Sequence, residues 1–371
     1  TLDPPATARA LVGAVACLAV MFAATRIGAR SPQRTFLFIV LGLSGVGVVS
    51  VGLFAALLNL APLFEPRIVF GNPNHLAGFL GLCAWPVLGL GLSSGFGSRR
   101  WLWLIGFAVI VIGIFLSLSR GGVGAFFLGA AIFSLLWMRS RALTTSSRWR
   151  RAIMPCAMLV TLGLVAFLGW DRVLSEMQTV SAVRSDTRAN LWPIALRMMT
   201  YFPLSGMGRG AFATTFPAFK VETDALTYTH LENEWLQLPL ELGLPVGLML
   251  IAVFIWTWVR VVRSPDLGPR DIGVLAGTAA LAAHNFVDFS LEIPGIALAF
   301  AMAFGLIAAR LRDRAPDRRL LIGAAFALPA CLVLGVAFQL AHGTIGDEAH
   351  LHNAPSAAEA AARAESMARW H

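Results

Sequence analysis

The chain alternates between long apolar runs and short polar segments. We identify ten runs of about the length that a membrane-spanning helix needs. They cover residues 8–25, 35–60, 76–93, 101–118, 123–138, 152–170, 236–259, 272–293, 295–309 and 320–341. These runs are continuously apolar and lack the alternation of barrel strands, which predicts an all-α, polytopic transmembrane protein.

One long polar segment, residues 171–235, interrupts this pattern between the sixth and seventh runs. Arginines dominate its first half, whereas acidic residues and a histidine dominate its second half. We predict a transmembrane domain over residues 1–341, with residues 171–235 as its one large loop. The tail, residues 342–371, is polar and rich in Ala, which indicates the start of a helical repeat domain that is cut off here.

Composition and charge place this domain in a membrane. The chain is 57% hydrophobic and only 13% charged, with a mean hydropathy of +0.72, which excludes an ordinary soluble protein. Its net charge of +9 comes largely from alternate short loops, which hold 18 of the 29 basic residues and 4 of the 20 acidic ones. That bias predicts cytoplasmic loops near residues 26–34, 99–100, 139–151, 260–271 and 310–319. Segment 171–235 and both chain ends would then lie outside.

The cysteines and the chain start add little about chemistry. Cys17, Cys83, Cys156 and Cys331 fall within predicted spans without paired spacing, as expected of apolar packing residues. We find no Asp-x-Asp motif or His/Cys cluster, so we predict no cofactor and no metal. The chain begins at Thr1, so we expect that it has been trimmed and that an N-terminal helix could be missing.

Arg120 lies alone at a predicted lipid–water boundary, in the tight turn SRGG (119–122). An arginine at that depth is unfavourable unless it is paired or reaches water. Its guanidinium matches phosphate oxygens in a bidentate fork, which favours diphosphate binding. The alternative is an interfacial anchor, which would not require the two glycines that follow.

Arg188 and Arg209 are the other candidate phosphate ligands in the long segment. Arg188 precedes residues 189–201, where the spacing of Trp192, Leu196 and Met199 predicts an amphipathic helix on the membrane surface. Arg209 lies in PLSGMGRGAF (203–212), a Gly-rich turn whose backbone amides would be free to help hold phosphate. For each, the alternative is a solvated surface arginine.

His230 and Glu232 are candidate general bases just before the seventh run. Histidine titrates near neutral pH, and a glutamate serves when it is desolvated. The alternative is a polar cluster at a helix N-terminus, where Glu232 and Glu234 favour the helix dipole.

Polar residues also recur every four positions in the eighth predicted run. His284, Asp288 and Glu292 would share one helix face near the outer surface. Both structural support of the long loop and a part in catalysis are consistent with this pattern.

Four motifs together resemble the O-antigen ligase and polymerase family of bacterial membrane glycosyltransferases. They are SRGG (119–122), R-x3-W-x2-A-x2-M-x4-PLSGMGRGAF (188–212), ENEWLQLPLELGLPVG (232–247) and HNFVDFSLEIP (284–294), in the family's usual order. Each motif is weakly specific alone, whereas their order within this topology is more specific. They span about half of the chain.

The resemblance implies a GT-C-like helical fold with a large outer loop over a lateral opening to lipid. It implies an undecaprenyl-diphosphate-linked glycan as donor, no nucleotide sugar and no metal. Arg120 and Arg188 match the arginines that face the diphosphate. The family's usual His-Asn-x-Tyr-Leu-Gln is Glu-Asn-Glu-Trp-Leu-Gln here, starting at Glu232. Either His230 replaces the histidine in space or Glu232 is the base.

We therefore expect an inverting, metal-independent glycosyltransferase at the outer face of the bacterial cytoplasmic membrane. His230 or Glu232 would act on the acceptor, whereas Arg120, Arg188, Arg209, Asn233, His284 and Asp288 would contact substrate. The acceptor would be a glycan, lipid A core or a protein, and no nucleic acid would bind. A flippase of lipid-linked sugars is the alternative, but it needs polar residues near the bilayer midplane. A non-catalytic role in polysaccharide assembly would leave the arginines and histidine unexplained.

Overall fold

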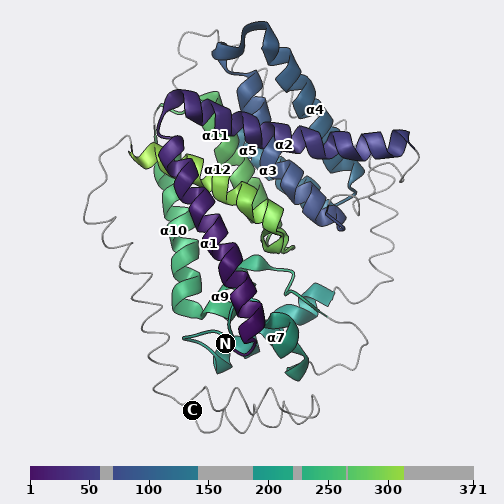
Figure 1. Cartoon of the computed structure of the whole chain (residues 1–371), viewed down its shortest axis with the longest axis vertical. Coiled ribbons are helices and arrows are strands. Elements are labelled where there is room, and N and C mark those ends of the chain that lie inside the picture. Colours follow the sequence, from purple (N-terminus) through teal and green to yellow (C-terminus); the bar gives the residue numbers. More distant parts are fainter. Residues whose placement is uncertain (59–69, 141–186, 220–227, 265, 313–371) are drawn as a thin grey trace. The chain divides into compact units, whose positions relative to one another are not determined.

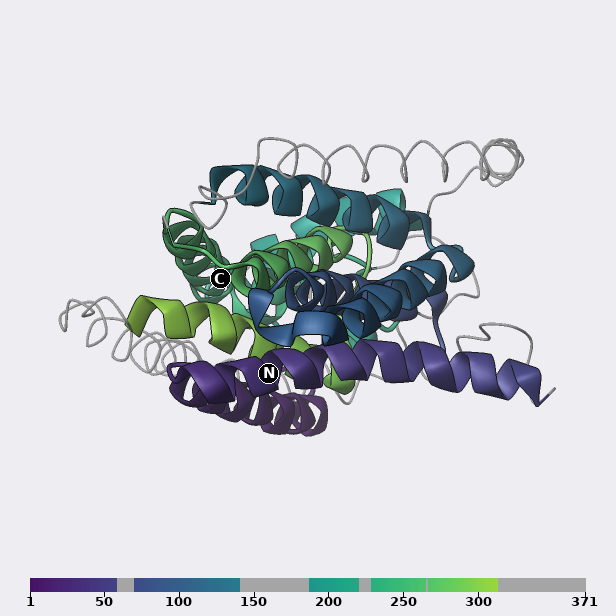
Figure 2. The ribbon, with the colours of Figure 1, turned by 90° about the horizontal axis from the view of Figure 1, so that it is seen from above.

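The computed structural model describes residues 1–58, 70–140, 187–219, 228–264 and 266–312 (Figure 1). Every regular element within these ranges is helical, as the two views in Figures 1 and 2 show. The elements are α1 (Pro4–Ile27), α2 (Ser31–Leu57), α3 (Pro73–Gly91), η2 (Ser94–Arg99), α4 (Arg100–Leu116), α5 (Arg120–Arg139), α7 (Thr187–Tyr201), α8 (Phe212–Thr215), η4 (Phe216–Ala218), α9 (Glu234–Leu242), α10 (Leu244–Val262), α11 (Pro269–His284), η5 (Ser290–Glu292) and α12 (Pro294–Arg312). The predicted all-α class is confirmed for the described residues.

Six of the described helices are long and apolar enough to cross a membrane, namely α1, α2, α4, α5, α10 and α12. The chain is therefore a polytopic helical membrane protein, as predicted. The apolar runs at 76–93 and 272–293 correspond to α3 and α11, which are not among the six. The predicted runs at 152–170 and 320–341 and the tail at 342–371 lie outside the described residues. A total of ten spans stays a prediction.

The chain divides into two compact units, each of which is described by itself. Among the described residues, the loop unit comprises 1–16, 187–219 and 228–256, and the bundle unit comprises 17–58, 70–140, 257–264 and 266–312.

Helix α3 forms the core of the bundle unit, because every residue from His75 to Gly91 is buried. It packs against α2, α4, α5 and, most extensively, α11. Gly273 and Gly277 of α11 face the α3 backbone. A Cβ atom at Gly277 would lie 2.4 Å from the carbonyl oxygen of Leu82. Such small residues let helices in lipid approach closely. As α11 packs along α3 in this way, the end of α11 lies beside the start of α3.

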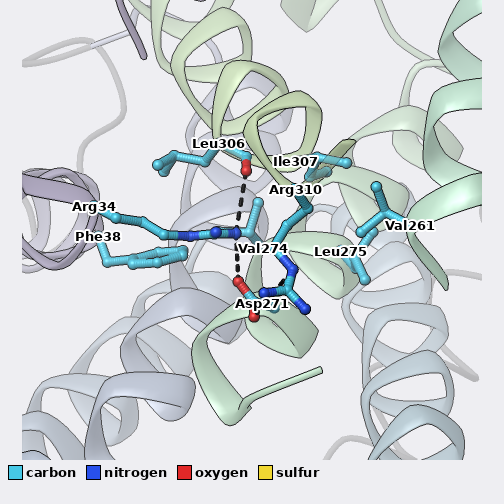
Figure 3. A pocket seen from close by; sticks show the side chains of 9 residues that line it. All are labelled: Arg34, Phe38, Val261, Asp271, Val274, Leu275, Leu306, Ile307 and Arg310. Atoms are coloured by element: carbon cyan, nitrogen blue, oxygen red, sulfur yellow. Dashed lines mark hydrogen bonds and ion pairs between the residues drawn. The ribbon is translucent and has the colours of Figure 1, made fainter. Parts of the chain in front are cut away.

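An ion-pair cluster joins three helices at the other end of α11 (Figure 3). Arg34 of α2 donates to the Asp271 carboxylate at 2.6 Å and to the carbonyl oxygen of Leu306 at 3.3 Å. Nε of Arg310 in α12 lies 3.8 Å from the same carboxylate. The recess that these side chains line has no room for a water-sized sphere. The cluster is therefore a packed connection between helices rather than a ligand pocket.

The same end of the bundle unit collects the ends of α3 and α5. Ser140, which follows α5, donates to the carbonyl oxygen of Leu267 at 2.8 Å. A Cβ atom at Gly89 of α3 would lie 2.5 Å from the carbonyl oxygen of Pro269. The basic segments after α3 and at the end of α5 thus share an end with Arg34, as the loop alternation predicts. That this end faces the cytoplasm stays a prediction.

The loop unit has its own apolar core. Helix α7 confirms the helix predicted at 189–201. Its buried residues are Leu191, Ala195, Met198 and Met199, whereas Leu196 is exposed. The buried side chains pack with Met207, Ala211, Phe212, Phe216, Leu231 and Leu240. The attachment of α7 to a membrane surface stays a prediction.

Two predicted spans do not form single continuous helices, so these predictions are wrong. The run at 236–259 is divided at Gly243 (φ +81°), a conformation that favours glycine, into α9 and α10. The run at 272–293 leaves the helix at His284, because the next residue, the buried Asn285, bonds to the carbonyl oxygen of Leu281 and accepts from the amide of Leu291. His284, Asp288 and Glu292 therefore do not share a helix face.

Candidate functional site

A buried histidine–aspartate cluster lies at one end of the bundle unit. Asp288, in the turn after α11, has its Oδ2 3.4 Å from Nδ1 of His75 and 3.4 Å from Nε2 of His284. Ser290 donates to the same oxygen. The structure thus brings together two predicted site residues, His284 and Asp288, with His75, which the sequence analysis did not select.

The Asp288 carboxylate is held in its ionised form by this surrounding. Burial raises its pKa, but the hydrogen bond with His75, the charge of His284 and the hydrogen bond from Ser290 together outweigh burial. The pKa of Asp288, which lies outside the candidate spans, is therefore below its usual value. The cluster can therefore hold a negative charge on Asp288 away from solvent.

Arg120 begins α5 beside this cluster. Ser119 caps α5, accepting from the amide of Gly122 at 3.1 Å, and it donates to Oδ1 of Asn74 in α3 at 2.8 Å. Leu118, with a φ of +57°, produces the sharp turn. The predicted turn is confirmed, and the Arg120 side chain is exposed at its start.

Two glycines let the start of α5 lie directly over the cluster. A Cβ atom at Gly122 would lie 2.3 Å from the Cβ of Ala77 and 3.3 Å from Cε1 of His284. Any side chain at Gly122 would therefore push α5 away from α3. The bundle unit thus places the exposed Arg120 guanidinium beside closely packed polar residues. A guanidinium in such a position suits an anionic group.

Asn72 is the N-cap of α3. Its side chain accepts from the amide of Asn74 at 2.8 Å, with Pro73 in the first helical turn. This leaves the Asn74 side chain to contact Ser119. The Asn74–Ser119 contact thus connects α3 to the start of α5.

In the loop unit, Arg209 is held between two buried carboxylates of α9. It donates to Oε2 of Glu241 at 2.7 Å and to Oε1 of Glu234 at 3.2 Å. Both glutamates are buried, whereas Arg209 is about one-fifth exposed. The guanidinium that the sequence offered to phosphate is therefore engaged within the protein.

Gln237 connects this ion pair to the backbone before α9. Its Nε2 donates to Oε1 of Glu241 at 3.3 Å, and its Oε1 accepts from the amide of Leu231 at 2.8 Å. A chain of hydrogen bonds thus runs from Arg209 through Glu241 and Gln237 to Leu231. All of these groups come from the loop unit.

The two candidate bases flank Leu231. His230 is half-buried, and its Nδ1 lies 3.1 Å from Oγ1 of Thr229. Glu232 is half-buried with a φ of +57°, a left-handed conformation that is uncommon for a residue other than glycine and clusters at functional sites. Asn233 is buried and caps α9 by accepting from the amide of Leu236 at 3.2 Å.

Arg188 is the second residue of α7, and its side chain lies outside the described residues. The diphosphate-binding role of Arg188 stays a prediction.

The Gly-rich turn at 203–210 has a structural role that the sequence analysis missed. The amides of Met207 and Gly208 donate to the carbonyl oxygens of Leu240 and Glu241 at 3.2 and 2.9 Å. These bonds give the last carbonyl groups of α9 the hydrogen-bond donors that they lack within the helix. These two amides are therefore not available to phosphate, contrary to the prediction. Close backbone approach explains the glycines, since a Cβ atom at Gly206 would lie 2.4 Å from the backbone of Glu241.

Sequence signals for the missed residues exist but are weak. Glu234, Gln237 and Glu241 have the spacing of one helix face, so their polarity within an apolar helix indicated a shared buried partner. His75 follows a helix start and precedes a long apolar run, and nothing local indicates its partner 213 residues away. Within the described residues, no group of three or more His, Cys, Asp or Glu side chains is arranged to hold a metal ion.

Comparison with known proteins bears on this site directly. A family model described as O-Antigen ligase matches residues 105–251, which include Arg120, Arg188, Arg209, His230 and Glu232. No curated protein and no solved structure matches the chain. The match agrees with the family suggested by the motif order, and it spans α4, α5, α7, α9 and part of α10.

Proposed function

From the premise that residues 105–251 form an O-antigen ligase domain, we propose that this chain is a membrane glycosyltransferase. It transfers a glycan from an undecaprenyl-diphosphate-linked donor to an acceptor hydroxyl, at the outer face of the bacterial cytoplasmic membrane. The acceptor is a growing glycan, lipid A core or a protein. The presentation of Arg120 carries this proposal.

Arg120 binds the donor diphosphate in this proposal. Its exposed guanidinium lies at the start of α5, where the helix dipole also favours an anion. The Ser119–Asn74 contact fixes the turn, so the guanidinium is oriented before the donor arrives. Arg188 is proposed as a second ligand from α7. Fixed cations stabilise the charge that develops on the leaving diphosphate, which is the largest electrostatic demand of this reaction.

His230 removes the acceptor proton, with Glu232 as the alternative. A histidine has an ordinary pKa near ~6.5, which matches a base working at neutral pH, whereas an ordinary glutamate titrates near ~4.3. Glu232, however, occupies the family's motif position and has the strained backbone. Asn233 supports either base by fixing the start of α9.

The reaction is a displacement with inversion. The acceptor oxygen forms a bond to the anomeric carbon while the bond from that carbon to the diphosphate oxygen breaks. The electron pair of the broken bond stays on undecaprenyl diphosphate, and the acceptor proton passes to the base. The step needs no metal in this proposal, because arginines take the role of the cation.

A flippase is the competing function, and the placement of charge favours the enzyme. In the described part of the bundle unit, the paired carboxylates lie at the two ends of α11, with Asp271 at one end and Asp288 at the other. These ends are about 24 Å apart for a helix of 16 residues. A flippase needs polar groups near the midplane instead.

Transfer by purified protein from a lipid-linked donor tests the proposal. Arg120→Lys keeps the charge but loses the fork, so we expect most of the activity to disappear while the protein still inserts and folds. His230→Ala should lower turnover by about 10²-fold or more, with Glu232→Gln clearly less affected. Near-normal transfer by the Arg120→Lys protein would show that this residue is only an anchor.

A further inference from the structure

Arg209 has a partner arrangement that does not suit a diphosphate ligand. Both arms of its guanidinium already contact buried carboxylates, those of Glu234 and Glu241. A diphosphate approaching Arg209 would meet both carboxylates, and like charges at such distances repel strongly in a buried setting. Arg209 must therefore be explained through the protein groups that it contacts.

Those contacts lead to the segment that carries the candidate bases. Glu241 accepts from Arg209 and from Gln237, and Gln237 accepts from the amide of Leu231. Leu231 is the single residue between His230 and Glu232, and its side chain is fully buried. A bond to this amide therefore fixes the backbone from which both bases extend.

The backbone at Glu232 needs such fixing. A non-glycine residue in a left-handed conformation is strained and persists only when its surroundings hold it there. Glu232 is held on one side by the Gln237 bond to Leu231 and on the other by the Asn233 cap of α9. Releasing either side would let this segment relax toward ordinary backbone angles.

We infer that Arg209, Glu241 and Gln237 act as positioning residues that hold the His230–Glu232 segment in its productive geometry. Arg209 orients Glu241, Glu241 orients Gln237, and Gln237 fixes the amide of Leu231. This inference rests on the proposed function for the identity of the bases, but the mechanical claim stands apart from it.

The test compares Arg209→Lys, Glu241→Gln and Gln237→Leu with Phe212→Leu. Phe212 is a buried residue of the same core that has no hydrogen bond to this network. Kinetics of purified protein should show kcat per folded molecule lowered about 10-fold or more in the three network variants, with the KM for the lipid-linked donor within about 2-fold of the parent. Phe212→Leu should keep its kcat per folded molecule.

Hydrogen exchange gives a readout that does not require activity. The amide of Leu231 should exchange faster in all three network variants than in the parent and in Phe212→Leu. Unchanged exchange in Glu241→Gln and Gln237→Leu would overturn the inference. So would a raised donor KM confined to Arg209→Lys, which is the result expected of a diphosphate ligand. If the parent protein transfers no glycan, the proposed function fails while the exchange result still decides the positioning role.

Discussion

The contact between α3 and α11 gives the sharpest quantitative test of the fold. Gly277 and Gly81 are both buried helical glycines of the bundle unit, but their surroundings differ. A Cβ atom at Gly277 would lie 2.4 Å from the carbonyl oxygen of Leu82, whereas a Cβ atom at Gly81 would meet nothing within 4 Å. Alanine at the two positions therefore adds the same methyl group to a closed and to an open site.

The difference in unfolding free energy between the two variants measures the cost of the steric clash at position 277. Replacing a helical glycine with alanine gains about 0.5–1 kcal/mol from backbone entropy in both cases. Gly277→Ala must also move α11 from α3 by roughly 0.6–1 Å, and overpacking of this kind typically costs about 1–3 kcal/mol. Gly81→Ala should therefore be slightly more stable than the parent protein. The unfolding free energy of Gly277→Ala should lie about 1–3 kcal/mol below that of Gly81→Ala.

Equilibrium unfolding in detergent, followed by tryptophan fluorescence, measures this difference. The displacement should also appear in function, because α11 carries His284 and leads to Asp288. A shift near 1 Å at a site can lower a rate by up to about 10²-fold. Equal stability of the two alanine variants would refute the close α3–α11 contact and the position of the cluster that depends on it.

Three further predictions concern charge. Asp271→Asn should lose about 1–3 kcal/mol of unfolding free energy, because two arginines of the cluster lose a carboxylate partner; an unchanged thermal midpoint would show that the ion pairs contribute nothing. The lowered pKa of Asp288 means that its stabilising contribution is full above the unfolded pKa near ~3.9 and is lost as pH falls through the lower folded pKa. Unfolding measured against pH should therefore show a loss in acid that Asp288→Asn lacks. For topology, cysteines placed at Arg148 and Lys220 in a cysteine-free protein should differ in labelling by an impermeant thiol reagent in intact cells. Only position 220 should react, and equal labelling would contradict the orientation.

Much of the fold follows from hydrophobic pattern alone, because a membrane helix is a local feature. The helices α1, α2, α4, α5 and α12 coincide with predicted apolar runs, and α10 forms the second part of the run predicted at 236–259. The turn before Arg120 was also predictable, since Ser-Arg-Gly-Gly combines a helix cap with residues that permit close approach. The two predicted spans that are interrupted share a cause. Gly243 interrupts one through its backbone geometry, and Asn285 interrupts the other through its side-chain hydrogen bonds. An average of hydropathy along the sequence detects neither feature.

The candidate site was less predictable, because its partners are distant in the chain. Arg209 was a reasonable phosphate ligand from its glycine neighbours, and only the fold reveals Glu234 and Glu241 beside it. His75 meets Asp288 across 213 residues. Sequence spacing identifies residues that share a helix face, whereas contacts between helices depend on packing that the spacing does not encode.

The burial of α3 has a consequence for how this protein is made. Its sequence contains Pro86 and begins with polar residues, and every residue from His75 to Gly91 is buried against other helices. Its most extensive partner, α11, is synthesised almost two hundred residues later. At the usual ribosomal rate of about 5–20 residues per second, α3 waits roughly 10–40 s for that partner. We therefore expect α3 to pack first against α2, α4 and α5, which lie close to it in the chain, and against α11 only later.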